Sequence, residues 1–267
     1  VEGSRSAQGQ ARLPSSAPIV IWVVLLALAA IGWAVTIFQA RSMGEMAGMP
    51  GMPGMSATAS PALPFLSVWI AMMVAMMFPS VAPTTAVFAA VGHTRSHAGR
   101  RAAPTWAFLL GYLMTWGMFG AGAYLLSLVA SDVSMMAPGL RVSHPVIGGL
   151  ILIFAGVYQW SPLKRLWLGH CRSPLVFFQQ EWQEGAIGAF RLGFTHGAHC
   201  VGCCAGLMLV LFAVGLMNLG WMALVAAAIF AEKVVPSGPL VGKLAGVAFL
   251  VSGVAMSVAP WWGQIFS

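Results

Sequence analysis

The sequence predicts an all-α fold, a polytopic bundle of about seven transmembrane helices. Two observations carry this prediction. Of the 267 residues, 59% are hydrophobic and only 7% are charged, whereas soluble domains contain roughly 25% charged residues. Apolar runs near the length that crosses a bilayer core, roughly 20 residues of helix, also recur along the chain. They extend over residues 18–38, 65–91, 104–130, 144–160, 192–217, 219–235 and 239–259.

The basic residues predict the orientation of this bundle. With the N-terminus inside, the outer segments hold only Arg41 and Arg141, and the inner segments hold the other basic residues. This imbalance follows the positive-inside rule, so we expect the N-terminus inside and the C-terminus outside. Topology then accounts for the net charge of +7, and no basic patch with interleaved aromatic residues indicates nucleic-acid binding. The inner set is Arg5, Arg12, Arg95, Arg100, Arg101, Lys164, Arg165, Arg172, Arg191, Lys233 and Lys243.

The apolar runs leave no room for a separate soluble domain. Residues 1–17, rich in Ser, Gly, Gln and Ala, are typical of a disordered tail, here cytoplasmic. Residues 18–267 are expected to form a single membrane domain. Within it, residues 39–64 form an outer loop rich in Met, Gly and Pro. Residues 161–191 form a cytoplasmic loop in which Phe177, Phe178 and Trp182 indicate contact with the membrane interface.

Methionine recurs at every third position in the outer loop. Glycines and prolines lie between these methionines, and at that density they predict neither helix nor strand. The side chains therefore belong to a solvated loop rather than to a packed core, and thioethers are soft ligands that suit Cu(I). We expect the loop to collect copper; a low-complexity linker is the alternative. The repeat consists of Met43, Met46, Met49, Met52 and Met55.

Pairs of methionines four residues apart occur in the second and third apolar runs. Residues at this spacing share one face of a helix. Such pairs suit a relay of thioether ligands through the bundle, and they suit equally the filling of irregular helix contacts. The pairs are Met72 with Met76, Met73 with Met77, and Met114 with Met118.

A group of histidines and cysteines begins the fifth run. It comprises His196, His199, Cys200, Cys203 and Cys204, all of which except His199 fall on one broad helix face. Thiolates and imidazoles bind either Cu(I) or Zn(II), and the outer methionines favour Cu(I). The alternative is tight packing of small residues, since free cysteine behaves as a small hydrophobe.

Two further features lie near the cytoplasmic side. Cys171 follows His170 in the 161–191 loop and is a further candidate ligand; thiols on this side stay reduced, so a structural disulfide is not expected. Glu232 and Lys233 end the sixth run. They are either a solvated helix end or, if they face the bundle, a pair that tunes the metal site or relays protons.

Five short motifs follow one another through the middle of the chain. They are Trp69-x-x-Met72-Met73-x-Ala75-Met76-Met77-x-Pro79, Tyr158-Gln159-x-Ser-Pro162-Leu-Lys164, Cys171-Arg172-x-Pro174, His196-Gly197-x-x-Cys200-x-Gly202-Cys203-Cys204 and Glu232-Lys233. Over roughly residues 60–240, this order resembles a bacterial family of predicted metal-binding integral membrane proteins, a domain family of unknown function. The resemblance implies a multi-pass protein of the bacterial inner membrane.

The chain departs from the family pattern at three positions. Trp167 stands where the family has a cysteine, which leaves Cys171 alone in its loop. Ala205 replaces a tryptophan, and His199 replaces an aromatic residue. We interpret His199 as an added ligand.

Three functions fit these observations. In the first, outer methionines capture Cu(I) and pass it to the His/Cys group for transport or metallation. In the second, Cys200 and Cys203 form a redox-active dithiol that Cys171 resolves. In the third, the chain is an accessory subunit with a structural metal site. Catalysis is not favoured, since the sequence has no phosphate loop, catalytic triad or paired carboxylates. The expected partners are the bilayer and a membrane complex or copper chaperone.

Overall fold

A computed structural model describes residues 17–47, 62–97, 103–136, 144–214 and 218–265. Within these ranges the protein is all-α, with nine helices and no strand. The helices are α1 (Ala17–Ala47), α2 (Ala62–His97), α3 (Thr105–Met136), α4 (His144–Trp160), α5 (Pro162–Arg172), α6 (Pro174–Glu181), α7 (Gly185–Val214), α8 (Leu219–Val234) and α9 (Gly238–Ile265).

Five of the described helices are long and apolar enough to cross a membrane, namely α1, α2, α3, α7 and α9. A sixth crossing results if α4 and α5, which meet at an angle of 63°, are taken as one bent span. The predicted all-α membrane bundle is therefore confirmed. Within the described residues, each of the expected apolar runs corresponds to a helix, but α4 has 17 residues and α8 has 16, which is short for a crossing of roughly 20 residues.

The expected outer loop is partly helical. Helix α1 continues to Ala47, so the prediction that Met43 and Met46 lie in a loop is wrong. The physical reason is that Gly44 is a lone glycine, which costs a helix only about 1 kcal/mol, whereas the dense Gly and Pro sequence begins at Gly48. The other three methionines of the repeat, and the expected tail over residues 1–16, lie outside the described residues.

The segment 161–191, expected to be a cytoplasmic loop, contains the short helices α5 and α6 and the start of α7. Pro162 occupies the first turn of α5, where its missing N–H is not needed. The side chain of Ser161 caps the same helix by accepting a hydrogen bond from the backbone N–H of Lys164 at 3.1 Å. These start signals, and a buried face that includes Lys164, Leu168 and Cys171, explain why the segment folds.

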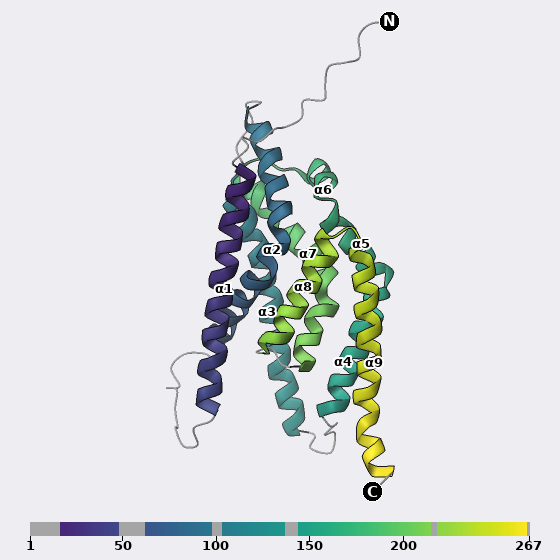
Figure 1. Cartoon of the computed structure of the whole chain (residues 1–267). Helices are drawn as coiled ribbons and strands as arrows, with labels where there is room; N and C mark the ends of the chain where they lie inside the picture. The colour runs from purple at the N-terminus through teal and green to yellow at the C-terminus, as the bar shows by residue number, and fades with distance from the viewer. Residues whose placement is uncertain (1–16, 48–61, 98–102, 137–143, 215–217, 266–267) are drawn as a thin grey trace, which may run out of the picture.

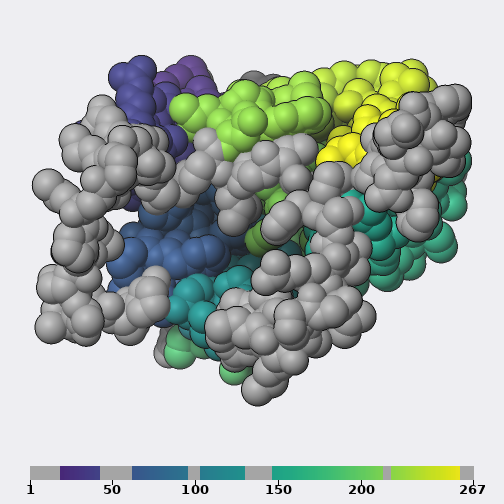
Figure 2. All heavy atoms as spheres, turned by 90° about the horizontal axis from the view of Figure 1, so that it is seen from below, coloured from purple at the N-terminus to yellow at the C-terminus, as the bar shows by residue number. Residues whose placement is uncertain are grey.

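Helix α7 is the centre of the bundle and packs on α3, α4, α5 and α8. Helix α1 pairs with α2, and α4 pairs with α9. Figure 1 shows α5 and α6 at the end where α9 begins, opposite the end where α1 stops. Seen from that opposite end, α1, α8 and α9 line one side of the bundle, and α2 and α3 lie on the other side (Figure 2).

Two glycines allow α3 and α7 to approach closely. A Cβ atom at Gly193 would collide with the backbone oxygen of Phe108, and one at Gly111 would collide with that of Phe190. Small residues at such crossings let membrane helices bring their backbones together. The contact brings the His/Cys face of α7 against Tyr112 of α3.

Candidate metal site

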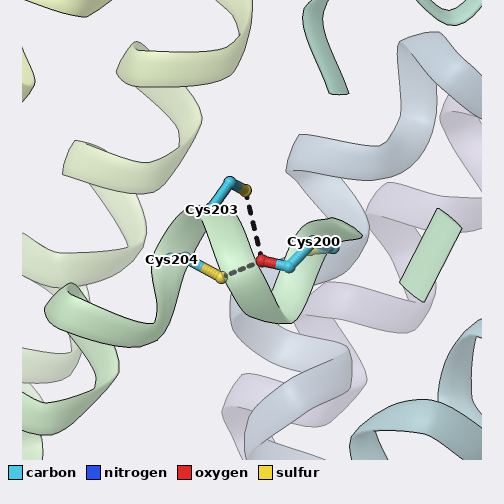
Figure 3. Close-up of side chains that lie close together, drawn as sticks. All are labelled: Cys200, Cys203 and Cys204. Atoms are coloured by element: carbon cyan, nitrogen blue, oxygen red, sulfur yellow. Dashed lines mark hydrogen bonds between the residues drawn. The ribbon is translucent and has the colours of Figure 1, made fainter. Parts of the chain in front are cut away.

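Three cysteines of α7 form what we call the thiol cluster, Cys200, Cys203 and Cys204. Their Sγ atoms all lie within 4.8 Å of one another, and each residue is at most 1% exposed. The thiols of Cys203 and Cys204 donate hydrogen bonds to the backbone oxygen of Cys200 at 3.1 and 2.7 Å (Figure 3). Metal–sulfur bonds of about 2.3 Å place three ligating sulfurs roughly 4 Å apart, so small rotamer changes would let all three bind one ion.

A fourth thiol reaches the cluster from another helix. Cys171 of α5 is buried, and its Sγ lies 3.6 Å from the Sγ of Cys203. All four cysteines are free. The structure thus places Cys171, from a segment expected to be a loop, next to Cys203 of α7.

Two polar groups surround the sulfur of Cys200. The ammonium of Lys233 lies 2.9 Å from this Sγ, and the hydroxyl of Tyr112 lies 3.0 Å from it. An ammonium group can only donate, so the sulfur of Cys200 accepts the Lys233 hydrogen bond. The positive charge lies opposite the negative charge of a thiolate, the form in which cysteine binds metal. No sequence spacing predicts the Tyr112 contact, which depends on the crossing of α3 and α7.

The neighbouring Glu232 has a different partner. Its carboxylate oxygens accept hydrogen bonds from the Lys164 ammonium at 2.8 and 2.7 Å, and the two side chains are 2% and 3% exposed. The amide oxygen of Gln159 also accepts from Lys164. The guanidinium of Arg172 donates to the backbone oxygen of Glu232, which ties α5 to α8. The solvated-end interpretation of Glu232 is wrong, because α5 folds back over this end of α8.

The two predicted histidine ligands occupy different environments. His196 is 3% exposed, contacts the rings of Tyr112 and Phe177, and its Nδ1 has no hydrogen-bond partner among the described residues. It lies one helical turn before Cys200. His199 is only partly buried, and its ring stacks on His170 with centroids 4.3 Å apart. Its nitrogens do not join the compact group of cysteine sulfurs.

The methionines of α2 lie inside the bundle, whereas Met114 and Met118 of α3 do not. The α2 methionines are at most 3% exposed and share one hydrophobic core with all four cysteines. Met208 and Met222 belong to the same core. Met114 and Met118 are 52% and 54% exposed, so the prediction that they relay metal through the bundle is wrong. The buried α2 set is Met72, Met73, Met76 and Met77.

Comparison with known proteins gives one family. Residues 66–256 match the model of the family PpoB2, which is described as a copper chaperone. This range covers more than half of the chain and includes all four cysteines and the four α2 methionines. It bears out the resemblance to a metal-binding membrane family. Neither a curated protein nor a solved structure matches the chain.

Proposed function

We propose a Cu(I)-handling function from one premise: this chain belongs to the PpoB2 family, which is described as a copper chaperone. The observation that carries the proposal is the thiol cluster, three buried sulfurs within 4.8 Å of one another. Thiolates are soft ligands that select Cu(I) over hard cations. In this proposal the thiol cluster binds Cu(I) as cargo, with Cys171 and His196 as the adjacent ligands. Zn(II) is the competing metal, because it also binds thiolates.

The charges around the cluster support a bound monovalent cation. Cu(I) held by two thiolates carries a net charge of −1, and an uncompensated buried charge costs several kcal/mol. The Lys233 ammonium, 2.9 Å from Cys200 Sγ, offsets this charge. Glu232 does not compete for Lys233, because its carboxylate is paired with Lys164. Binding would release protons from the thiols that become ligands.

We place the cluster in a protein of the bacterial inner membrane with seven crossings and the N-terminus inside. Helix α1 then delivers the methionine repeat of residues 43–55 to the outer side. Cu(I) would pass from this repeat to the buried methionines of α2, and from these weak thioethers to the tighter thiolates. The shared core of α2 methionines and cysteines supports this route. The end point is transport, or metallation of a copper-requiring membrane complex or a copper chaperone.

Metal analysis of the detergent-purified protein tests this function. After anaerobic loading with Cu(I) and desalting, we expect copper equal to the protein concentration. A variant with Cys200, Cys203 and Cys204 changed to Ser is expected to lose it, because hydroxyls are poor Cu(I) ligands. Changing the exposed Met114 and Met118 to Leu provides the matched control and should leave copper unchanged. A loaded wild-type protein without copper would contradict the proposal.

The distance between Cys171 and Cys203 favours a second candidate function, thiol redox chemistry. Their sulfurs are 3.6 Å apart, and a disulfide bond of about 2.05 Å requires only a small movement. We expect mild oxidation with diamide to join these two residues, as detected by peptide mass spectrometry after alkylation. Cys171→Ser should abolish this product. If oxidation forms no disulfide among the four cysteines, thiol redox chemistry is contradicted.

A further inference from the structure

We propose that His170 and His199 form a separate Cu(I)-binding pair at the surface of the α5–α7 contact, which exchanges Cu(I) with the thiol cluster. The inference rests on the proposed function and deepens it, because it assigns the place where the buried site meets an aqueous donor or acceptor of Cu(I). Its ligands are two imidazoles, and no cysteine takes part in this outer pair.

The two rings face each other across the contact between two helices. His170 belongs to α5 and His199 to α7, with ring centroids 4.3 Å apart and an angle of 18° between the ring planes. His170 is exposed and His199 is partly buried, so an ion can reach the pair from outside. The Trp167 and Phe177 rings lie 5.2 and 5.6 Å from the His199 ring and hold it in place.

The hydrogen bonds of both rings leave the same nitrogen available. The Nδ1 of His170 lies 2.9 Å from the backbone oxygen of Leu166, and the Nδ1 of His199 lies 2.8 Å from that of Thr195. A carbonyl oxygen can only accept, so each Nδ1 carries the proton and each Nε2 presents its lone pair. Metal-binding histidines are commonly hydrogen-bonded in this way, with the second ring nitrogen bonded to a backbone carbonyl. Because each lone pair lies in its ring plane, one ring must rotate out of the stack before both Nε2 atoms bind the same ion.

The histidine pair lies next to a pair of buried thiols. His170 directly precedes Cys171, and His199 lies one helical turn before Cys203, whose Sγ is 3.6 Å from that of Cys171. The α5–α7 contact therefore carries two successive ligand pairs, imidazoles at the surface and thiols inside. The buried His196 offers a third imidazole near the thiols, because its Nδ1 has no hydrogen-bond partner among the described residues.

Exchange along this contact is a ligand substitution. Cu(I) leaves two imidazole nitrogens and binds thiolate sulfurs, and the protons of those thiols are released. The ion keeps its oxidation state in both directions, so the step needs neither oxidant nor reductant. The alternative is that the histidines only pack against Trp167 and Phe177. Replacement by phenylalanine separates the two explanations, because it keeps an aromatic ring and removes the ligand nitrogen.

The first experiment uses the full chain in detergent with all four cysteines changed to Ser. In equilibrium with free Cu(I) and without desalting, we expect this variant to bind Cu(I) weakly, with nitrogen neighbours in X-ray absorption spectra beside any methionine sulfur. Adding His170→Phe and His199→Phe should remove the nitrogen neighbours, and adding His93→Phe should not. Absence of nitrogen-bound Cu(I) from the cysteine-free variant would overturn the histidine pair. It would leave the proposed function standing, because metal analysis of the wild-type protein tests that separately.

The second experiment keeps the cysteines. With His170→Phe and His199→Phe, we expect an unchanged equilibrium affinity of the thiol cluster for Cu(I). Removal of Cu(I) by a soluble chelator should slow about tenfold, which corresponds to ~1.4 kcal/mol of activation free energy. An unchanged removal rate would overturn the exchange role. The melting temperature in detergent serves as the control for packing and should match the wild type.

Discussion

Replacing Glu232 by alanine is expected to lower the free energy of unfolding by about 3–5 kcal/mol, because the Lys164 ammonium would be left buried without its counter-ion. The pair is bidentate, with distances of 2.7 and 2.8 Å, and both side chains are at most 3% exposed. Only the amide oxygen of Gln159 would still accept from Lys164. Unfolding in mixed micelles by titration with SDS measures this change.

A double substitution is the control for this prediction. Changing Lys164 to Met and Glu232 to Leu removes both charges together with the cost of burying them. Replacing a whole buried ion pair by apolar residues is often neutral or stabilising, so the double variant should unfold close to the wild type. If Glu232→Ala alone unfolds like the wild type, water reaches Lys164 and the pair is not buried in the membrane protein.

Replacing Lys233 by leucine is expected to weaken Cu(I) binding about 10- to 100-fold, the usual cost of losing a partner next to the metal ligands. The ammonium contacts Cys200 Sγ at 2.9 Å and Ser80 Oγ at 3.4 Å. Leucine supplies neither a charge nor a sulfur ligand, so the negative charge of the thiolate–Cu(I) complex would lie uncompensated in the bundle. Competition with a Cu(I) chelator of known affinity measures the change.

Two further variants test whether the lost positive charge is what weakens Cu(I) binding. Lys233→Arg keeps the positive charge and is expected to retain most of the affinity. Ser80→Ala removes only the second contact of the ammonium and should change the affinity little. Equal affinities for Lys233→Leu and the wild type would show that the cluster binds Cu(I) without this counter-ion.

The sequence predicts what depends on spacing within one helix. The interval between Cys200, Cys203 and Cys204 places three thiols on one face, and the structure confirms their proximity. Contacts between helices have no such signal. Tyr112 and Lys233 meet Cys200 only because α3 and α8 pack around α7, and Cys171 reaches Cys203 because an expected loop is the helix α5.

The same distinction between spacing within a helix and contacts between helices explains which methionines are buried. Spacing predicts that Met114 and Met118 share a face with each other, as Met72 and Met76 do. It does not predict which face points inward, because a membrane helix is apolar on all sides. In the structure the α2 methionines are buried, and Met114 and Met118 are about half exposed. The predicted boundaries agree best for the runs 144–160 and 219–235, which correspond to α4 and α8, and least well at the end of the first run, because α1 continues beyond residue 38 to Ala47.

In the proposed function, the 63° bend between α4 and α5 bears on which metal the thiols would bind. Helix α7 alone supplies three sulfurs, one fewer than the tetrahedral set that Zn(II) takes in structural sites. The fourth sulfur, on Cys171, arrives only while α5 stays folded against α7 and α8, where Arg172 bonds the backbone of Glu232. A shift of α5 would therefore lower the number of sulfur atoms available to a metal from four to three without moving α7. Selectivity between zinc and copper is thereby coupled to the docking of one short helix.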